Sequence, residues 1–545
     1  MEAPTLKTRL INFLENNRGL VVLIFCLPAS FIFDLVLKTR HWFYHTFLSA
    51  PEDHDKRVKE IQRRVAEWNK QPQKERKLLC TARPNWLSLS TTFFRKDLCE
   101  RIPIPLYDVL ELNESNLSVK VEPMVTVGDI TKYLIPKGYT LAVTLEIADA
   151  TLGGLAFGTG MTTHSHKAGL YQETIISYDV VLADGSLINV RKDNEHSELF
   201  YALPWSHGSL CFLVALELRI IPVKPYVHMQ YIPVSGQQNY CKIMQDLSGA
   251  NDKDKKLPDF LEATLFNKHD AVVMIGNFAK KEEFPKLKIN RMSRWYKPWF
   301  YKYVEKFLRL KARSTTNEDL KIKGEELIPL RDYLLRHNRS IFWVVEDMLP
   351  FGNDSLFRLF LGWLLPPKIA FLKWTTTPGV RELTFTKQVF QDIVLPLSKL
   401  EDQVNKSEEL FDLYPLLVYP CRVYDRGPGK GQVPRPLPEY LCPGTDYAMY
   451  NDLGIYGVPG FVKRKEKYNP VYAMREMEKF TRDVKGFSFL YADIFMTEEE
   501  FNEMFDLTLY ERVRKKYGAE NAFPRLYDKV KPEVDVQAIG QKYAN

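Results

Sequence analysis

The sequence predicts an α+β protein with one N-terminal membrane-anchor helix and a body of at least two packed domains. Three observations lead to this prediction: an apolar run near the N-terminus, short strand-like segments that alternate with helical ones, and a length of 545 residues. At about 100–200 residues per domain, this length allows two or three packed units. The composition, 45% hydrophobic and 13% aromatic, provides enough apolar surface for a large core.

Charge and cysteine content exclude several classes of protein. The 75 basic and 68 acidic residues give a net charge of +7, which is too dilute for a dedicated nucleic-acid-binding protein. A mean hydropathy of −0.27 excludes a polytopic membrane protein. The seven cysteines contain no CxxC pair, and an odd count is typical of reduced thiols in a reducing compartment. No His/Cys cluster has metal-ligand spacing, so we predict no metal site.

The apolar run Leu20–Leu37 predicts the anchor. It has 14 uncharged residues before Asp34, and as a helix of 18 residues it would extend about 27 Å, close to the hydrocarbon thickness of a bilayer. Pro28 and Asp34 fit a spanning helix poorly, so a buried core helix is the alternative. We expect a single-pass anchor at about 20–37 inside an N-terminal segment 1–45, and the flanking charges leave its orientation open.

The body begins with an amphipathic helix and continues with strand signals. The helix follows the anchor, and its apolar positions have helical spacing: Val58, Ile61, Val65 and Trp68. Next come an alternating strand, a helix between Asp129 and Gly138, and two strands joined by the turn Asp184-Gly185. This order is typical of an α+β nucleotide-binding domain. We predict domains at 46–222 and 223–545.

A second apolar stretch, Ser340–Trp374, is rich in Phe, Leu and Trp, but Gly352, Pro366 and Pro367 interrupt it. It is therefore too broken to span a bilayer. It fits a core or cap segment, a monotopic membrane contact, or the wall of an apolar ligand pocket.

The segment Thr151–Thr163 carries the chemical signal. Its glycines at 153, 154, 158 and 160 let the backbone approach a ligand closely, and exposed N–H groups can surround pyrophosphate oxygens. It matches neither the dinucleotide GxGxxG motif nor a P-loop. Taken alone, such a cluster fits either turns or a cofactor site.

The order of motifs around this segment resembles the FAD-binding domain of the vanillyl-alcohol-oxidase (PCMH) type. T-L-G-G-x-x-x-G-T-G at 151–160 is followed by S-x-K-x-G-L at 165–170 and by Y-x-V-V-L-A-D-G-S at 178–186. Within that superfamily the chain is similar to the 24-dehydrosterol reductases, the diminuto/seladin family. The similarity extends over Tyr296-Lys-Pro-Trp-Phe, Arg339-Ser-Ile-Phe-Trp, Pro350-Phe-Gly-Asn, Leu490-Tyr-Ala-Asp and Phe501-Asn-Glu-Met-Phe-Asp.

The resemblance implies a two-subdomain FAD-binding domain, a C-terminal α+β substrate domain, and reduction of the 24(25) double bond of sterols with FAD and NADPH. It implies a protein of the endoplasmic reticulum membrane with a cytosolic catalytic body; it leaves the oligomeric state open. The implied flavin contacts are Thr151, Leu152, Gly153, Gly154, Leu155, Ala156, Phe157, Gly158, Thr159, Gly160, Met161, Thr162, Thr163, Ser165, Gly169, Arg83 and Pro84.

Three positions depart from the expected pattern: Ala82, Asn85 and Cys211 stand where glycine is expected. They keep open a catalytically weakened sterol-binding homologue, and an oxidase of the same superfamily is a further alternative. For the His residues of the flavin loops, His164, His166 and His207, a covalent flavin link is conceivable, but the family does not suggest one.

The reaction needs a proton donor because an isolated alkene has no carbonyl that could be polarised. Protonation at carbon 24 would place the charge on carbon 25, where hydride from the flavin would quench it. Tyr456, Tyr491 and Asp493 are the catalytic residues that we predict. Packing in the core or at a strand edge is the alternative role of each tyrosine.

Overall fold

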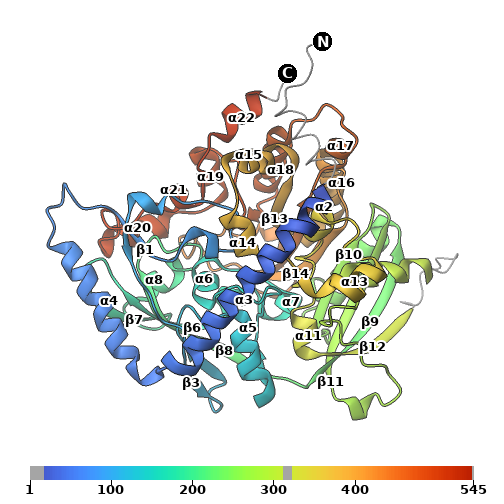
Figure 1. The fold of residues 1–545 in the computed structure, drawn as a ribbon, viewed down its shortest axis with the longest axis horizontal. Coiled ribbons are helices and arrows are strands. Elements are labelled where there is room, and N and C mark those ends of the chain that lie inside the picture. The colour runs from blue at the N-terminus through green and yellow to red at the C-terminus, as the bar shows by residue number, and fades with distance from the viewer. Residues whose placement is uncertain (1–17, 311–321, 543–545) are drawn as a thin grey trace.

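The computed structural model describes residues 18–310 and 322–542, so residues 1–17 of the predicted N-terminal segment lie outside the description. Two antiparallel sheets form the body, and a long N-terminal helix crosses one face of it (Figure 1). This helix comprises α2 (Arg18–Val21), η1 (Val22–Cys26), α3 (Leu27–Phe43) and η2 (Tyr44–Leu48). Within the described residues, one helix, Gly19–Leu48, is long and apolar enough to cross a membrane.

Pro28 lies inside this helix without breaking it. The turn before it, η1, is π-helical, and Pro28 occupies the first turn of α3. A wider π turn relieves the ring clash and the missing N–H donor that a proline brings into a helix. The helix predicted over 20–37 is therefore confirmed, and it extends to Leu48.

Helix α4 (His54–Asn69) follows, and its predicted apolar face is confirmed: Val58, Ile61, Val65 and Trp68 are all buried. Its opposite face carries charged side chains in ion pairs such as Arg64–Glu60. The helix covers the first sheet from outside, where the Gln62 side chain donates a hydrogen bond to the Gly185 carbonyl at 2.8 Å.

The first sheet has the strand order β3-β4-β8-β6-β7, with β5 paired to β8. Its strands are β3 (Val109–Asn113), β4 (Ser118–Val121), β5 (Tyr139–Leu141), β6 (Ile175–Val181), β7 (Leu187–Arg191) and β8 (Phe212–Pro222). The predicted hairpin is β6–β7, and Gly185 has a φ of +87° in its turn. The predicted helix is α5 (Val127–Leu134), which a capping box of Thr126 and Asp129 begins. A separate parallel pair, β1 (Leu79–Thr81) and β2 (Glu100–Ile102), lies beside this sheet.

The second sheet starts just after β8 and has the order β12-β9-β11-β10-β14-β15-β13-β16. Its strands are β9 (Tyr226–Ser235), β10 (Phe260–Leu265), β11 (Asp270–Ala279), β12 (Gly324–Pro329), β13 (Val389–Pro396), β14 (Leu416–Tyr424), β15 (Tyr447–Gly457) and β16 (Phe487–Ser488). Helices α9 (Gln237–Ser248), α16 (Leu400–Phe411) and α18 (Pro470–Asp483) bury one of its faces in a core of their own. The other face turns toward the first sheet and shares its core.

The C-terminal helices return to the first sheet. They are α19 (Glu498–Met504), α20 (Thr508–Lys516) and α21 (Leu526–Val530). The Leu79 N–H donates to the Ala522 carbonyl at 2.7 Å, and the Arg514 side chain donates to the Ser209 carbonyl at 2.8 Å. Residues far apart in sequence therefore build one core around the first sheet.

The apolar stretch 340–374 forms short helices beside the N-terminal helix: α12 (Val344–Met348), α13 (Ser355–Leu361), η10 (Gly362–Leu364) and α14 (Ile369–Trp374). Both η10 and α14 contact α3. Further α-helices outside the glycine segment are α8 (Ser197–Ala202), α10 (Phe300–Glu305), α11 (Leu330–Leu334), α15 (Pro378–Lys387), α17 (Gly460–Lys463) and α22 (Val536–Lys542).

Candidate functional site

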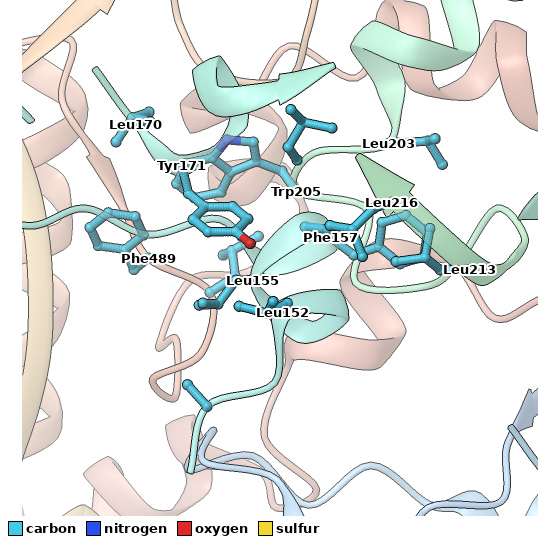
Figure 2. Close-up of a cluster of buried hydrophobic side chains, with 14 of the residues drawn as sticks. Leu152, Leu155, Phe157, Leu170, Tyr171, Leu203, Trp205, Leu213, Leu216 and Phe489 are labelled. Carbon is cyan, nitrogen blue, oxygen red and sulfur yellow. The ribbon is translucent and has the colours of Figure 1, made fainter. Parts of the chain in front are cut away.

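The glycine segment forms the short helix α6 (Leu152–Gly158), which the Thr151 hydroxyl caps by accepting a hydrogen bond from the Gly154 N–H at 3.3 Å. Leu152, Leu155 and Phe157 point into a core that includes Leu213 and Leu216 of β8 (Figure 2). Of the predicted flavin contacts, these buried side chains and that of Ala156 thus hold the helix in place. They leave only their backbone for a ligand.

The glycines of this segment have different structural reasons for lacking a side chain. A Cβ on Gly153 would lie 2.8 Å from the Pro123 carbonyl oxygen, so packing within the protein explains this glycine. A Cβ on Gly158 would meet only the His207 ring, at 3.5 Å, which is ordinary contact. Gly154 is exposed, but its Cβ would lie 2.9 Å from the Thr151 hydroxyl, so the contact with the capping residue explains this glycine. Gly158 therefore leaves space that the protein does not fill.

Strained backbone faces this space. Thr159 has a φ of +59°, Trp205 of +68° and His207 of +50°, in a region that costs a non-glycine residue about 1–3 kcal/mol each. The His207 N–H donates to the Phe157 carbonyl at 3.1 Å and so joins the two strained turns. The buried Thr159 Oγ1 and His207 Nε2 have no hydrogen-bond partner among the described residues. Both atoms are free to bind a polar ligand.

Cations surround the same place. The Arg83 guanidinium donates to the Thr151 hydroxyl at 3.2 Å, while its buried Nε has no partner within the described chain. The Lys529 ammonium donates to the Gly208 carbonyl at 3.1 Å, and Lys96 donates to the Arg83 carbonyl at 2.7 Å. Burial lowers the pKa of both lysines to about 8. The described residues bring no carboxylate into contact with Arg83, Lys96 or Lys529, so this cluster suits the diphosphate of FAD.

The segment around Arg83 has ordinary backbone geometry. Neither Ala82 nor Asn85 has a positive φ, and the same holds for Cys211. Pro84 is exposed and begins the 3-10 turn η4 (Asn85–Leu87). The backbone conformation therefore does not require glycine at these three positions.

The end of the glycine segment connects the two sheets. The Thr162 hydroxyl donates to Glu146 at 3.0 Å, and the Thr163 carbonyl accepts from the Leu261 N–H of β10 at 2.9 Å. Ser165 accepts a hydrogen bond from the Thr162 N–H. Gly160 and Met161 are buried, and Gly169, with a φ of +77°, ends the short helix α7 (Ser165–Ala168). These residues define where the second sheet meets the glycine segment.

His164 and His166 also serve this connection. His164 Nδ1 lies 2.5 Å from the Asp259 carbonyl oxygen, and the two ring nitrogens of His166 lie 3.1 Å and 2.9 Å from the carbonyl oxygens of Thr163 and Pro258. Burial lowers the pKa of His164 to about 4 and that of His166 to about 3. Their ring nitrogens are thus engaged in holding the chain before β10.

The face of the second sheet that turns toward the glycine segment carries buried acids. Side chains two residues apart on a strand share a face. Asp452 and Tyr456 of β15 therefore point the same way, and Asp392 of β13 opposes Gly454 between them. Tyr456 and Asp392 are hydrogen-bonded through their side chains. A Cβ on Gly454 would lie 2.9 Å from the Tyr456 hydroxyl, so this glycine makes room for the pair.

The pKa values of these acids are raised to neutral pH or beyond. Burial, with the negative charge of Glu146, raises the pKa of Asp392 to about 7 against the hydrogen bond from Tyr456. Burial, with the charges of Asp392 and Glu146, raises the pKa of Asp452 well above its ordinary range. Burial likewise raises the pKa of Glu146 to about 7, although the cation Arg336 opposes the shift. The site thus provides buried carboxyl groups that can hold or release a proton near neutral pH.

An aromatic stack joins the acids to the strained turn. Trp205 stacks on Phe489 with ring centroids 5.5 Å apart, and Phe489 stacks on Tyr491 at 5.8 Å. The Phe489 N–H donates to the Asp392 carbonyl at 3.0 Å. Strand β13 thus lies between β15, which carries Tyr456, and β16, which is followed by Phe489 and Tyr491.

The third predicted catalytic residue, Asp493, is engaged in an ion pair. It forms a two-point ion pair with Arg381, both distances being 2.7 Å, and accepts a hydrogen bond from the Thr91 hydroxyl. This arrangement holds the chain around residue 91 to α15. Sequence reasoning missed Asp392, although a lone acid in the apolar run VFQDIVLP (389–396) was a signal that could have identified it.

Comparisons with known proteins agree with this geometry. The model of a family described as an FAD binding domain matches residues 97–191. A human Delta(24)-sterol reductase is 40% identical over 518 residues, which cover 95% of this chain and 94% of the human one. A Caenorhabditis elegans Delta(24)-sterol reductase homologue is 38% identical over 97% of both chains. A Delta(24)-sterol reductase of Arabidopsis thaliana is 36% identical and covers 97% of this chain and 94% of the plant one. The chain carries an FAD-binding domain and belongs to the Delta(24)-sterol reductase family.

Proposed function

We propose that this protein reduces the 24(25) double bond of sterols, with FAD as its cofactor and NADPH as the reductant. The observation that supports the reaction best is the hydrogen-bonded Asp392–Tyr456 pair, which lies on the sheet face beside the glycine segment. When bound, reduced FAD supplies a hydride. The chain must supply the proton, a dry site and stabilisation of positive charge.

The proton comes from the Asp392–Tyr456 pair. The Tyr456 hydroxyl delivers a proton to carbon 24, and Asp392 returns one to the tyrosine oxygen. The two electrons of the double bond form the new C–H bond, and the charge then lies on the more substituted carbon 25. The reaction therefore needs one proton and one hydride, and the carboxylate of Asp392 regains its proton from solvent after each turnover.

Aromatic rings beside Tyr456 stabilise the charge. The Tyr456 ring lies 5.3 Å from the Phe342 ring and 5.5 Å from the Trp343 ring, between centroids. Trp343 also donates its indole N–H to the Tyr456 carbonyl at 2.9 Å, which fixes this group. Faces of aromatic rings attract a cation by about 0.5–2 kcal/mol each. The same rings exclude water, which would otherwise capture the cation.

FAD is held mainly by backbone and cations. Gly154, Gly158, Thr159 and the Thr151 hydroxyl face the open side of α6, and Arg83 with Lys529 takes the diphosphate. The other predicted flavin contacts, whose side chains pack inward, contribute N–H and C=O groups. His207, whose pKa burial lowers to about 3, is neutral and has a free Nε2 for a flavin oxygen or nitrogen.

The N-terminal helix indicates association with a membrane. We propose the endoplasmic reticulum as the membrane and the cytosol as the side of the catalytic body. The free thiols of all seven cysteines are consistent with a reducing compartment. The single-pass arrangement predicted from the sequence stays a prediction.

One experiment tests the reaction and its alternatives. The protein is purified in mild detergent and its flavin absorbance recorded; NADPH and a Δ24 sterol are then added without oxygen. We expect bleaching by NADPH, recovery of absorbance with sterol, and a saturated side chain in the product. A colourless protein, or flavin that NADPH does not reduce, would contradict the proposal. Rapid reoxidation by air without sterol turnover would instead indicate an oxidase.

A further inference from the structure

The N-terminal helix exposes one apolar side along its whole length. Ile24, Phe25, Ile32, Leu35 and Val36 are all exposed, and spacings of three, four, seven and eight residues place them on one side of the helix. The helix thus presents an apolar surface on the side that faces away from the body. A soluble protein would cover this surface.

Helix α13 and the turn after it extend the same apolar surface. Leu356, Leu359 and Phe360 are exposed by 71%, 57% and 67%, which is unusual for large apolar side chains on a short helix. Trp363 of η10 packs against Phe31 of α3, with ring centroids 5.1 Å apart. The two segments, 24–48 and 356–374, therefore form one surface, which we call the apolar face.

The opposite side of the helix is fixed to the body. Leu27 and Ser30 are buried, and the Ser30 hydroxyl accepts a hydrogen bond from the Lys368 N–H at 2.7 Å. The Lys368 ammonium lies 3.1 Å from an Asp34 carboxylate oxygen, and His41 binds Asp129 at 2.9 Å. These contacts extend over more than ten residues of α3. A helix that left the body to span a bilayer would break all of them and carry Asp34 into hydrocarbon, which is costly.

The length of the helix also favours an in-plane position. Its 30 residues correspond to about 45 Å, whereas the hydrocarbon core of a bilayer is about 30 Å thick. A helix in the plane of a leaflet has no such limit.

A basic cavity opens at the edge of the apolar face. It has a volume of about 440 Å³, and Trp363, which belongs to the apolar face, is part of its wall. Arg291, Arg294 and Arg339 also line it, with Asp332 as its one acid among the lining residues. Arg291 and Arg294 are exposed. Positive charge at the depth where an apolar surface ends suits phospholipid phosphates.

We propose that the apolar face is a monotopic docking surface that enters one leaflet of an anionic bilayer, with the arginine cavity at the level of the headgroups. The N-terminal helix then lies in the plane of the membrane and does not cross it. Both ends of the helix, and the whole body, lie on one side. This seating concerns the position of the protein on lipid and is independent of the reaction proposed above.

The first experiment tests topology. Full-length protein with one epitope at the N-terminus and another at the C-terminus is expressed in cells, and sealed microsomes are treated with antibodies. We expect both epitopes to react before the membrane is permeabilised. An N-terminal epitope that reacts only after permeabilisation would show that the helix spans, and would overturn the proposal without affecting the proposed reaction.

The second experiment tests the face itself, in the full-length protein. In the variant Leu356→Glu/Phe360→Glu we expect the fraction released from microsomes by alkaline carbonate to rise about tenfold. The matched control is Leu98→Glu/Leu187→Glu, which changes two exposed leucines of the first domain and is expected to release like the wild type. Equal release from all three proteins would contradict the docking surface. Flavin absorbance of each variant shows that the fold is retained.

The third experiment tests the cavity. Purified protein binds phosphatidylcholine liposomes with or without phosphatidylserine, and we compare the wild type with Arg291→Gln/Arg294→Gln. At about fivefold per basic residue, the double variant is expected to bind the anionic liposomes about 30-fold more weakly. Binding to neutral liposomes is expected to be unchanged. Unchanged binding to both kinds of liposome would refute the role of the cavity.

Discussion

Replacement of Asp392 by asparagine tests the proton donor. Asp392→Asn keeps the shape of the side chain and leaves a hydrogen-bond partner for Tyr456, but it removes the acid. General acids of this kind contribute about 10²–10⁴ in rate, so we expect the reduction of sterol to slow by that factor. The flavin should stay bound because the cofactor contacts lie on the glycine segment. Tyr456→Phe should have a loss of similar size.

The pH dependence of the rate of sterol reduction tests the same role of Asp392. The pKa of Asp392 is raised to about 7, so the protonated fraction falls as the pH rises through 7. We expect the rate of the wild type to decrease above about pH 7. We expect Asp392→Asn to have a low rate without this decrease, because the group that titrates is gone.

The free energy of unfolding should also depend on the protonation of Asp392. A carboxyl group whose pKa is higher in the folded protein binds more protons there than in the unfolded chain. The free energy of unfolding therefore falls as the pH rises from about 4 through 7, and a shift to about 7 corresponds to a loss on the order of 4 kcal/mol. Asp392→Asn removes this loss, so the variant should be the more stable protein at pH 8.

The assay is a single turnover of protein reduced with NADPH, in which flavin absorbance reports reoxidation by the sterol. Glu478→Gln is the matched control: Glu478 is also fully buried, with a pKa raised to about 8, but it lies on α18 behind the sheet. We expect this control to change stability and not the rate. A rate for Asp392→Asn within about threefold of the wild type would refute Asp392 as the source of the proton that Tyr456 delivers, since a general acid contributes far more.

Three further predictions concern the cofactor and one ion pair. Gly158→Ala should fold normally, because its Cβ meets only the His207 ring, but should lower the affinity for FAD by about tenfold or more; Gly379→Ala, at an open position, is the control. Lys529→Met should weaken FAD binding by about 10–100-fold and abolish the decrease in affinity that we expect as the pH rises through about 8. Asp493→Asn should lower the free energy of unfolding by about 2 kcal/mol and leave the single-turnover rate unchanged, because Asp493 holds Arg381; a slower rate at unchanged stability would make it catalytic.

Local features of the fold could be predicted from the sequence. Periodicity identified the apolar face of α4, and Asp129 near the start with Gly138 after the end identified α5. The turn Asp184-Gly185 identified a hairpin because its glycine must adopt a positive φ. In each case residues close in sequence determine the structure, so a short window contains the information.

Features that depend on distant segments could not be predicted. A side chain at position 153 would clash with Pro123, which lies some thirty residues earlier in the sequence. No pattern within the glycine segment distinguishes Gly153 from Gly158. Likewise the ion pair of Asp493 could not be predicted, because its partner Arg381 is more than a hundred residues away in the sequence. Such a distinction between packing and ligand contact needs the tertiary structure, and the sequence prediction treated these residues alike.

The position of the acids shows the same dependence on remote segments. Asp392 acquires its raised pKa from burial and from Glu146, which lies on the other side of the junction between the two sheets. Phe489 holds the backbone of Asp392 on one side and stacks on Trp205 on the other. A chain segment near the C-terminus therefore sets the distance between the proton donor and the strained turn beside the glycine segment. Substitutions that loosen this stack should slow the proton transfer even though they touch neither sterol nor acid.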